Sequence, residues 1–282
     1  EACNDAAYLN SHYLAMRLLG KTLRFTVDLA GAGCGCNAAF YLTSMRQNND
    51  PSVCGDFYCD ANKVCGVSCA EIDIMEANQY AYHSTMHTQD DHKGFFKGYG
   101  GGDDFIGPRD WKGSEYGPGG TCVDTSMPFD VAASFHMDVF GQLDSMQVEL
   151  SQGDPPCRLE TRLEGYTGLA EISDALAAGV TPVIAYWSSD EMLWLDGAGP
   201  DGGGPCARDD AQSCSKHVRM YDFSVEEIGA PRPQTAPPAP VTPAPTPQPV
   251  QAAPALPATH LPRSQPVPPG PPARCPGSIA VG

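Results

Sequence analysis

Hydrophobic and polar residues alternate along much of the first 230 positions. From Thr22 to Leu29 every second residue is apolar and the residues between them are polar or charged. Side chains of a strand point alternately to its two faces, so this pattern predicts a half-buried β-strand. Similar runs predict strands at 38–45, 69–76, 131–139, 145–150, 183–187, 192–195 and 217–223, and one short helix is predicted at 168–178. Gly-rich connectors separate these elements, so the sequence predicts an all-β fold of the sandwich type.

The composition changes near residue 230. Of the 27 prolines, 18 lie in the segment 231–282, which contains no acidic residue. Such a segment cannot bury enough apolar surface to offset its ordering entropy. We therefore predict one domain at 1–230 and a disordered, extended Pro-rich linker or tail at 231–282. No binding module is recognised in the residues that follow Cys275.

The charge excludes some classes of partner. The formal net charge is −17, and all 34 acidic residues precede Pro231. Nucleic acids and anionic membrane surfaces bind positive patches, so neither is an expected partner, whereas a neutral polysaccharide is compatible with this charge. No stretch reaches the roughly 20 apolar residues needed to span a bilayer, and no hydrophobic signal peptide opens the chain at Glu1.

The chain contains twelve cysteines, which indicates an oxidising compartment. The alternative is a zinc site built from Cys54, Cys59, Cys65 and Cys69. These four contain no Cys-x-x-Cys pair, and their spacing fits no common zinc finger, so disulfides are favoured.

Three carboxylates lie within six residues in the run Glu-Ile-Asp-Ile-Met-Glu-Ala-Asn, residues 71–78. Glu71 and Asp73 share one face of the predicted strand, but Glu76 has the opposite parity and joins them only if the strand bends or bulges near Met75. Like charges held together raise one another's pKa, which suits a glycosidase that needs one ionised and one protonated carboxyl group. From these residues alone, an acidic strand edge or a calcium site is an equal alternative.

The same run closely resembles the active-site strand of glycoside hydrolase family 7, the retaining cellulases, in which Trp or Leu is more frequent at the position of Met75. Further pieces are similar to the family and occur in its order. They are the strand pair at 18–28 and 34–41, Tyr-Gly-Pro-Gly at 116–119, Tyr-Trp at 186–187 and Met-Leu-Trp-Leu-Asp at 192–196. Together they cover most of residues 11–229.

The resemblance implies the family's curved, concanavalin A-like jelly roll of two antiparallel sheets, with substrate on the concave face. It implies Glu71 as nucleophile, Glu76 as acid/base and Asp73 as the residue that tunes the nucleophile. It also implies that His87 supports the acid/base. A His83-x-x-x-His87 metal site is the alternative, but such a pair suits a metal on a helix, and this segment is not predicted to be helical, so no metal is expected and His83 is expected to be solvated.

Substrate-binding positions follow by the same resemblance. Trp187 and Trp194 match tryptophans that stack on sugar rings, although for each the alternative is a place in the core. Arg109 matches an arginine that binds sugar hydroxyls on the leaving-group side, and Asn37 and Tyr41 match residues that line the cleft. Gly203 stands where cellobiohydrolases have a second arginine.

The resemblance also implies disulfides between Cys34 and Cys206 and between Cys59 and Cys69, and leaves the other eight cysteines unassigned. Compared with the family, the chain lacks counterparts of the upstream strands and has a short connection between Cys59 and Cys69, so the domain is expected to be incomplete. We expect a secreted, monomeric, cofactor-free retaining β-1,4-glucanase that acts on cellulose or cello-oligosaccharides by cellobiohydrolase- or endoglucanase-like hydrolysis. The alternative is a non-catalytic glucan-binding relative.

Overall fold

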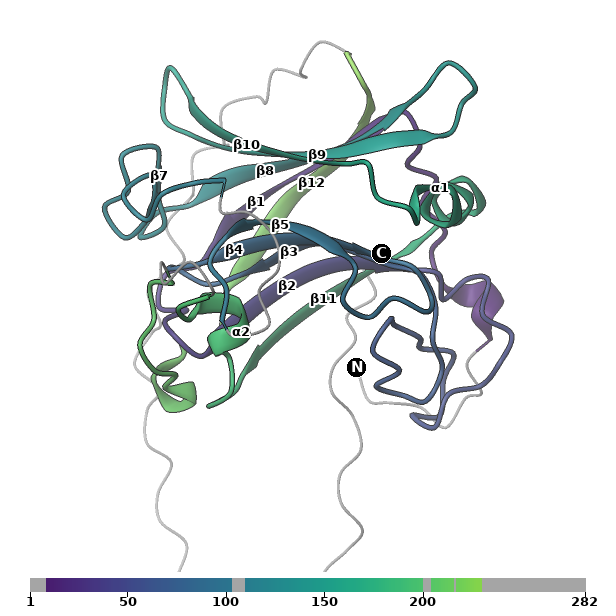
Figure 1. The fold of residues 1–282 in the computed structure, drawn as a ribbon, viewed down its shortest axis with the longest axis horizontal. Coiled ribbons are helices and arrows are strands. Elements are labelled where there is room, and N and C mark those ends of the chain that lie inside the picture. Colours follow the sequence, from purple (N-terminus) through teal and green to yellow (C-terminus); the bar gives the residue numbers. More distant parts are fainter. Residues whose placement is uncertain (1–8, 103–109, 200–203, 216, 230–282) are drawn as a thin grey trace, which may run out of the picture. The chain divides into compact units, whose positions relative to one another are not determined.

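Two antiparallel five-stranded sheets form the centre of the described structure (Figure 1). The computed structural model describes residues 9–102, 110–199, 204–215 and 217–229. The first sheet has the strand order β10-β9-β8-β1-β12 and the second the order β11-β2-β3-β4-β5. This architecture confirms the predicted all-β sandwich of the jelly-roll type. The predicted tail at 231–282 lies outside the described residues, so it stays a prediction.

The strands of the first sheet are β1 (Lys21–Asp28), β8 (Phe129–Met137), β9 (Leu143–Gln152), β10 (Cys157–Glu164) and β12 (Arg219–Glu227). Those of the second are β2 (Cys36–Thr43), β3 (Glu71–Ala77), β4 (Tyr82–His87), β5 (Phe95–Tyr99) and β11 (Thr181–Ser188). A small parallel pair joins β6 (Tyr116–Gly117) to β7 (Val123–Asp124), and two 3-10 turns lie at Asn10–His12 and Ala211–Ser213.

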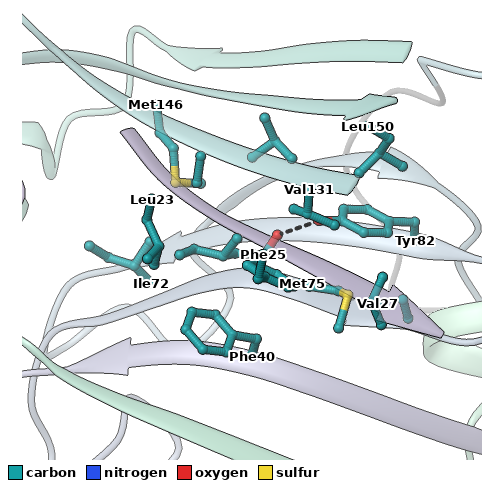
Figure 2. Close-up of a cluster of buried hydrophobic side chains, with 14 of the residues drawn as sticks. Leu23, Phe25, Val27, Phe40, Ile72, Met75, Tyr82, Val131, Met146 and Leu150 are labelled. Atoms are coloured by element: carbon teal, nitrogen blue, oxygen red, sulfur yellow. Dashed lines mark hydrogen bonds between the residues drawn. The ribbon is translucent and has the colours of Figure 1, made fainter. Parts of the chain in front are cut away.

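The core lies between the two sheets (Figure 2). Leu23, Phe25 and Val27 of β1 are at most 1% exposed, as their alternation predicts. The Phe25 ring packs against Phe40 of β2 with 4.8 Å between centroids. Because β2 and β3 direct their apolar residues into this core, their polar residues lie on the opposite face of the second sheet.

The helices differ from the sequence prediction at one place. The predicted helix at 168–178 is present as α1 (Leu169–Ala178). The predicted strand at 192–195 is wrong, because this segment forms the one-turn helix α2 (Leu193–Asp196). A short apolar run has no periodicity that separates a strand from a helix, which explains the error. None of the helices that the structure describes has the length and apolar character that a bilayer crossing needs.

Candidate active site

A β-bulge in β3 brings the three carboxylates to one face of the second sheet. Phe40 of β2 pairs with Met75, whereas the next residue, Tyr41, pairs with Asp73, so β3 contains one extra residue, Ile74. The pairing with β4 shifts at the same place. The bend that the parity of Glu76 requires is therefore present.

The register with β2 shows the result of this bulge. Glu71, Asp73 and Glu76 pair with Thr43, Tyr41 and Ala39, which are alternate residues of one strand and so share a face. The peptide oxygen of Ile74, left out of the register, accepts hydrogen bonds from Tyr82 Oη at 3.0 Å and Ser84 Oγ at 2.8 Å. Two fully buried hydroxyl groups of β4 thus stabilise the bulge from the core side.

Each carboxylate has its own polar partner. Asn37 Nδ2 donates to Glu76 Oε1 at 3.0 Å, and the backbone N–H of Ala61 donates to Glu71 Oε2 at 2.9 Å. His87 Nε2 lies 3.1 Å from Asp73 Oδ2. Glu71 and Asp73 are only 7% and 6% exposed, so these contacts form in a largely water-free environment.

One proton lies between His87 and Asp73. His87 Nδ1 is 3.0 Å from the carbonyl oxygen of Asp91, which can only accept, so Nδ1 carries a hydrogen. The contact at Nε2 then needs a second proton, either on the ring or on the Asp73 carboxyl group. The histidine ring is therefore fixed in orientation and coupled to the middle acid of the cluster.

Burial raises the pKa of all three carboxyl groups. The pKa of Glu76 rises to about 8, through burial and then the charge of Asp73, against the opposing hydrogen bond from Asn37. The pKa of Asp73 rises to about 7, through burial and then the charge of Asp60. Burial and the neighbouring Asp73 also raise the pKa of Glu71, while the Ala61 N–H opposes this rise. The cluster therefore retains protons near neutral pH, as a general acid requires.

The segment between Cys54 and Cys69 supplies residues that sequence reasoning missed. Asp60 is 3% exposed and acts electrostatically on Glu71 and Asp73, so it is a fourth acid of the cluster. Tyr58 Oη lies 2.8 Å from Tyr41 Oη and fixes this predicted cleft residue. No local pattern marks Asp60 or Tyr58, because only the folded loop brings them to the sheet.

The two tryptophans predicted to bind sugar rings lie side by side. Trp187 of β11 and Trp194 of α2 stack with 6.4 Å between ring centroids and 23° between their planes. Trp187 is 43% exposed, whereas Trp194 is partly buried and packs against the small apolar cluster of Ala81, Met192 and Leu195. Trp187 pairs with Asn37 in the sheet, which places this pair, the aromatic platform, beside the residue that contacts Glu76. Arg109 and Gly203 lie outside the described residues.

The histidine expectations are partly corrected. The segment 82–87 is strand β4, and His83 is 3% exposed rather than solvated, because its side chain faces the ring of Phe96 at 5.8 Å. Along a strand, residues four apart are separated by roughly 13 Å, so the His83-x-x-x-His87 metal site is wrong. Cys34, Asp196 and Cys206 form a cluster of potential metal ligands among the described residues, but its two sulfur atoms form a disulfide.

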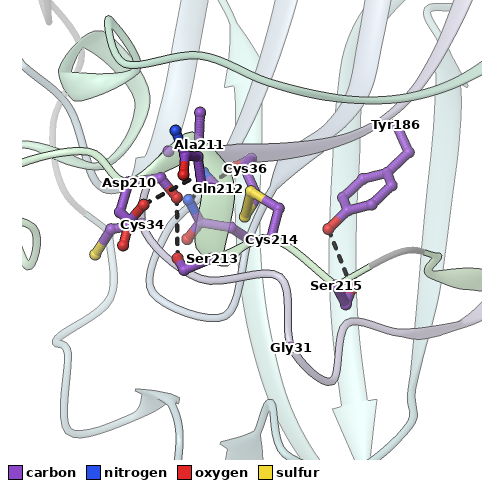
Figure 3. Close-up of a disulfide and its surroundings, with 12 residues drawn as sticks. Gly31, Cys34, Cys36, Tyr186, Asp210, Ala211, Gln212, Ser213, Cys214 and Ser215 are labelled. Atoms are coloured by element: carbon purple, nitrogen blue, oxygen red, sulfur yellow. Dashed lines mark hydrogen bonds between the residues drawn. A yellow bond between two sulfur atoms is a disulfide. The ribbon is translucent and has the colours of Figure 1, made fainter.

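Five disulfides join the described residues, and four of them involve loops or strands next to the second sheet. The expected pairs Cys34–Cys206 and Cys59–Cys69 are both present. The further pairs are Cys36–Cys214, Cys54–Cys65 and Cys122–Cys157. Figure 3 shows Cys34 and Cys36 beside the turn at 210–215, where Tyr186 Oη also contacts Ser215 Oγ at 3.1 Å. All ten cysteines described are thus paired, which excludes the zinc site at 54–69.

Comparison with known proteins finds endoglucanases among the relatives of this chain. No family model matches the chain. Endoglucanase EG-1 of Hypocrea jecorina is 29% identical over 268 residues, which cover 78% of this chain and 56% of the relative. Endoglucanase 1 of Pyricularia oryzae is 28% identical over 254 residues, covering 69% of this chain and 59% of the relative. The sequence of this chain is thus related to those of endoglucanases. It spans a little over half the length of these two relatives.

Solved structures of family 7 share the fold. An endoglucanase I complexed with cellobiose superposes with a TM-score of 0.57 at 21% identity, covering 76% of this chain and 70% of that chain. A family 7 cellobiohydrolase from Daphnia pulex also gives a TM-score of 0.57, at 19% identity, covering 78% and 73%. This chain therefore shares its fold with a glycoside hydrolase family 7 enzyme.

Proposed function

We propose that this protein is a retaining β-1,4-glucanase that hydrolyses cellulose or cello-oligosaccharides. The bulge at Ile74 carries this proposal, because it turns Glu76 onto the face that already holds Glu71 and Asp73. A retaining glycosidase needs a nucleophile and a general acid whose carboxyl groups are about 5–5.5 Å apart, and a single bent strand can supply both. The endoglucanase relatives support cellulose as the substrate class.

Glu71 is the nucleophile in this mechanism. Its carboxylate attacks the anomeric carbon and forms a glycosyl-enzyme, while Glu76 donates its proton to the leaving oxygen. A pKa of about 8 keeps Glu76 protonated at neutral and acid pH, which suits this first step. Glu76 then removes a proton from the water that releases the sugar. The N–H of Ala61 stabilises the negative form of Glu71 before the attack.

Asp73 and Asn37 are positioning residues for this pair. Asp73 raises the pKa of both glutamates, and its Oδ2 lies 3.1 Å from His87 Nε2, which holds its carboxyl group in place. Asn37 holds one oxygen of Glu76 and lies beside Trp187 in the sheet. The Trp187–Trp194 pair binds the apolar face of a sugar ring, and Tyr41 and Arg109 bind other parts of the glucan.

We further propose that the enzyme works outside the cell as a monomer and needs no cofactor. Five disulfides among the described residues support an oxidising compartment. The acidic net charge is compatible with a neutral polysaccharide as substrate.

Reducing-sugar release from a soluble cello-oligosaccharide tests this function. We expect turnover by the wild type, none by Glu71→Gln, and unchanged turnover by the control Glu164→Gln, which alters an exposed acid on β10 of the other sheet. Oligosaccharide binding should persist in Glu71→Gln, because glutamine preserves size and hydrogen bonding. Binding without turnover by the wild type would instead show a non-catalytic glucan-binding protein.

A further inference from the structure

A buried carboxyl group lies at the end of the helix that carries Trp194. Asp196 is 0% exposed, and its Oδ2 accepts hydrogen bonds from Gly35 N at 3.0 Å and Asn78 Nδ2 at 2.6 Å. Its backbone oxygen accepts from Cys206 N at 2.8 Å. Asp196 therefore joins α2 to the turn after β1, to the end of β3 and to the loop that returns to β12.

A second carboxyl group faces the first. The carboxyl group of Asp209 lies within hydrogen-bonding reach of Asp196, and its Oδ2 accepts from the backbone N–H of Met192. Oδ1 of each residue is shielded from water, and neither atom has a hydrogen-bond donor among the described residues. Two carboxylates can only accept, so a bond between them requires one shared proton.

These contacts link the aromatic platform to the acid strand. Asn78 follows Glu76 by two residues, and its Nδ2 donates both to Asp196 and, at 3.0 Å, to the backbone oxygen of Cys36. At the other end, Asp196 closes the single turn that presents Trp194 to Trp187. A helix of four residues has little stability of its own, so its position depends on such contacts.

We propose that Asp196 and Asp209 share a proton, that this bond holds Trp194 in its stack on Trp187, and that loss of the proton releases the platform. Asp196 is thus a positioning residue for the sugar-binding pair. Only the statement that this pair binds a sugar ring rests on the proposed function. The tryptophan stack itself can be observed without any sugar.

The direction of the pH effect follows from the shared proton. Burial raises the pKa of Asp196 from its ordinary value of 3.8 to about 6. The hydrogen bonds from Gly35 and Asn78 oppose this rise, and the charge of Asp209 adds to it. A raised pKa means that the stabilising contribution is complete below about pH 4 and is lost as the pH rises through about 6. The platform should therefore be ordered in acid and loosened above neutrality.

Few other titratable groups face the pair. On β4, His83 lies close to Gly100, and the next residue, Gly101, donates its backbone N–H to the Leu195 carbonyl oxygen of α2. On the loop itself, Asp190 and Asp210 are exposed and accept backbone hydrogen bonds of the turn at 210–212. The adjacent Cys34–Cys206 disulfide does not titrate.

Circular dichroism tests the proposal directly. Two close indole rings give an exciton couplet, and the third tryptophan, Trp111, is buried against Tyr82 and Tyr116. The couplet is assigned as the part of the spectrum that Trp194→Phe removes. We expect the wild-type couplet to weaken several-fold between about pH 4 and about pH 8.

Asp209→Asn should keep the couplet at both pH values, because its amide can donate to an ionised Asp196 while its oxygen still accepts from Met192 N. In Asp196→Asn the new amide can likewise donate to an ionised Asp209, so this variant replaces Asp209→Asn in the test if Asp209→Asn folds poorly. The control Asp210→Asn, an exposed neighbour that contacts Gln212 N in the turn of Figure 3, should titrate like the wild type. A wild-type couplet that does not change with pH, or one that fades equally in Asp209→Asn and Asp196→Asn, would overturn the proposal. Neither result depends on sugar hydrolysis.

Discussion

The hydroxyl groups that support the bulge allow a quantitative test of its role. Tyr82 Oη and Ser84 Oγ both donate to the Ile74 carbonyl oxygen, and both side chains are fully buried. Removal of either hydroxyl leaves the carbonyl group with one donor. We therefore expect Tyr82→Phe and Ser84→Ala each to lower the free energy of unfolding by about 1 kcal/mol.

The double variant should lose more than the sum of the two. With both hydroxyl groups removed, a buried carbonyl group outside the strand register is left without these donors, which costs a further 1–3 kcal/mol or so. A coupling energy of about 1 kcal/mol or more between the two sites should result. Urea unfolding of the four proteins measures it, with Ser134→Ala, which removes a hydroxyl contact to Thr22 in the other sheet, as the control.

Turnover of a cello-oligosaccharide should follow the same pattern. Because the bulge places Glu76 beside Asp73, the double variant should lose at least about tenfold in kcat/KM, equivalent to about 1.4 kcal/mol, and each single variant less. Additive losses of stability together with unchanged turnover would refute the claim that these hydroxyl groups maintain the bulge.

Three further predictions concern the acid cluster, the Cys34–Cys206 disulfide and the width of the groove. Because the pKa of Glu76 is raised to about 8, its stabilising contribution is complete below about pH 4.5 and is lost as the pH rises through about 8. The wild type should therefore become less stable across that interval, and in urea titrations the stability of Glu76→Gln should depend less on pH. Equal pH dependence in the two proteins would contradict this. The Cys34→Ser/Cys206→Ser variant should lose up to about 5 kcal/mol of stability, since its disulfide closes a loop of 172 residues, and an unchanged melting temperature would contradict this. The short Cys59–Cys69 connection should leave an open groove, so chromatography of the products from a long glucan should reveal internal cuts, and nearly pure cellobiose would argue against it.

The sequence was informative where side chains alternate cleanly and less so where polar residues enter the core. Strand β1 follows directly from its pattern. Strand β4 was missed because Tyr82, Ser84 and Met86 face the core while histidines and a threonine face the acids, so both faces contain polar residues. Ser84 is polar although it faces the core, because it donates to the carbonyl oxygen of Ile74 in the bulge of β3. That partner lies ten residues away in the chain, so no local pattern indicates it.

The acid cluster was predictable in part. The parity of Glu76 required a bulge, and the bulge is present, but its support from β4 depends on tertiary contacts. Asp60 could not be found from spacing, since two disulfides and the loop between them bring it to the sheet. Strand β10 was also missed, although buried Leu159, Thr161 and Leu163 alternate with exposed charged residues; its low apolar content is the reason, because a threonine takes the middle buried position.

The identity of the nucleophile is the central claim, and covalent trapping tests it most directly. An activated 2-deoxy-2-fluoro cellobioside forms a glycosyl-enzyme that hydrolyses slowly, so peptide mapping by mass spectrometry can locate the modified residue. We predict one adduct per molecule, on Glu71, and none in Glu71→Gln. An adduct on another residue, or no adduct in a protein that releases the leaving group, would contradict a retaining mechanism through Glu71.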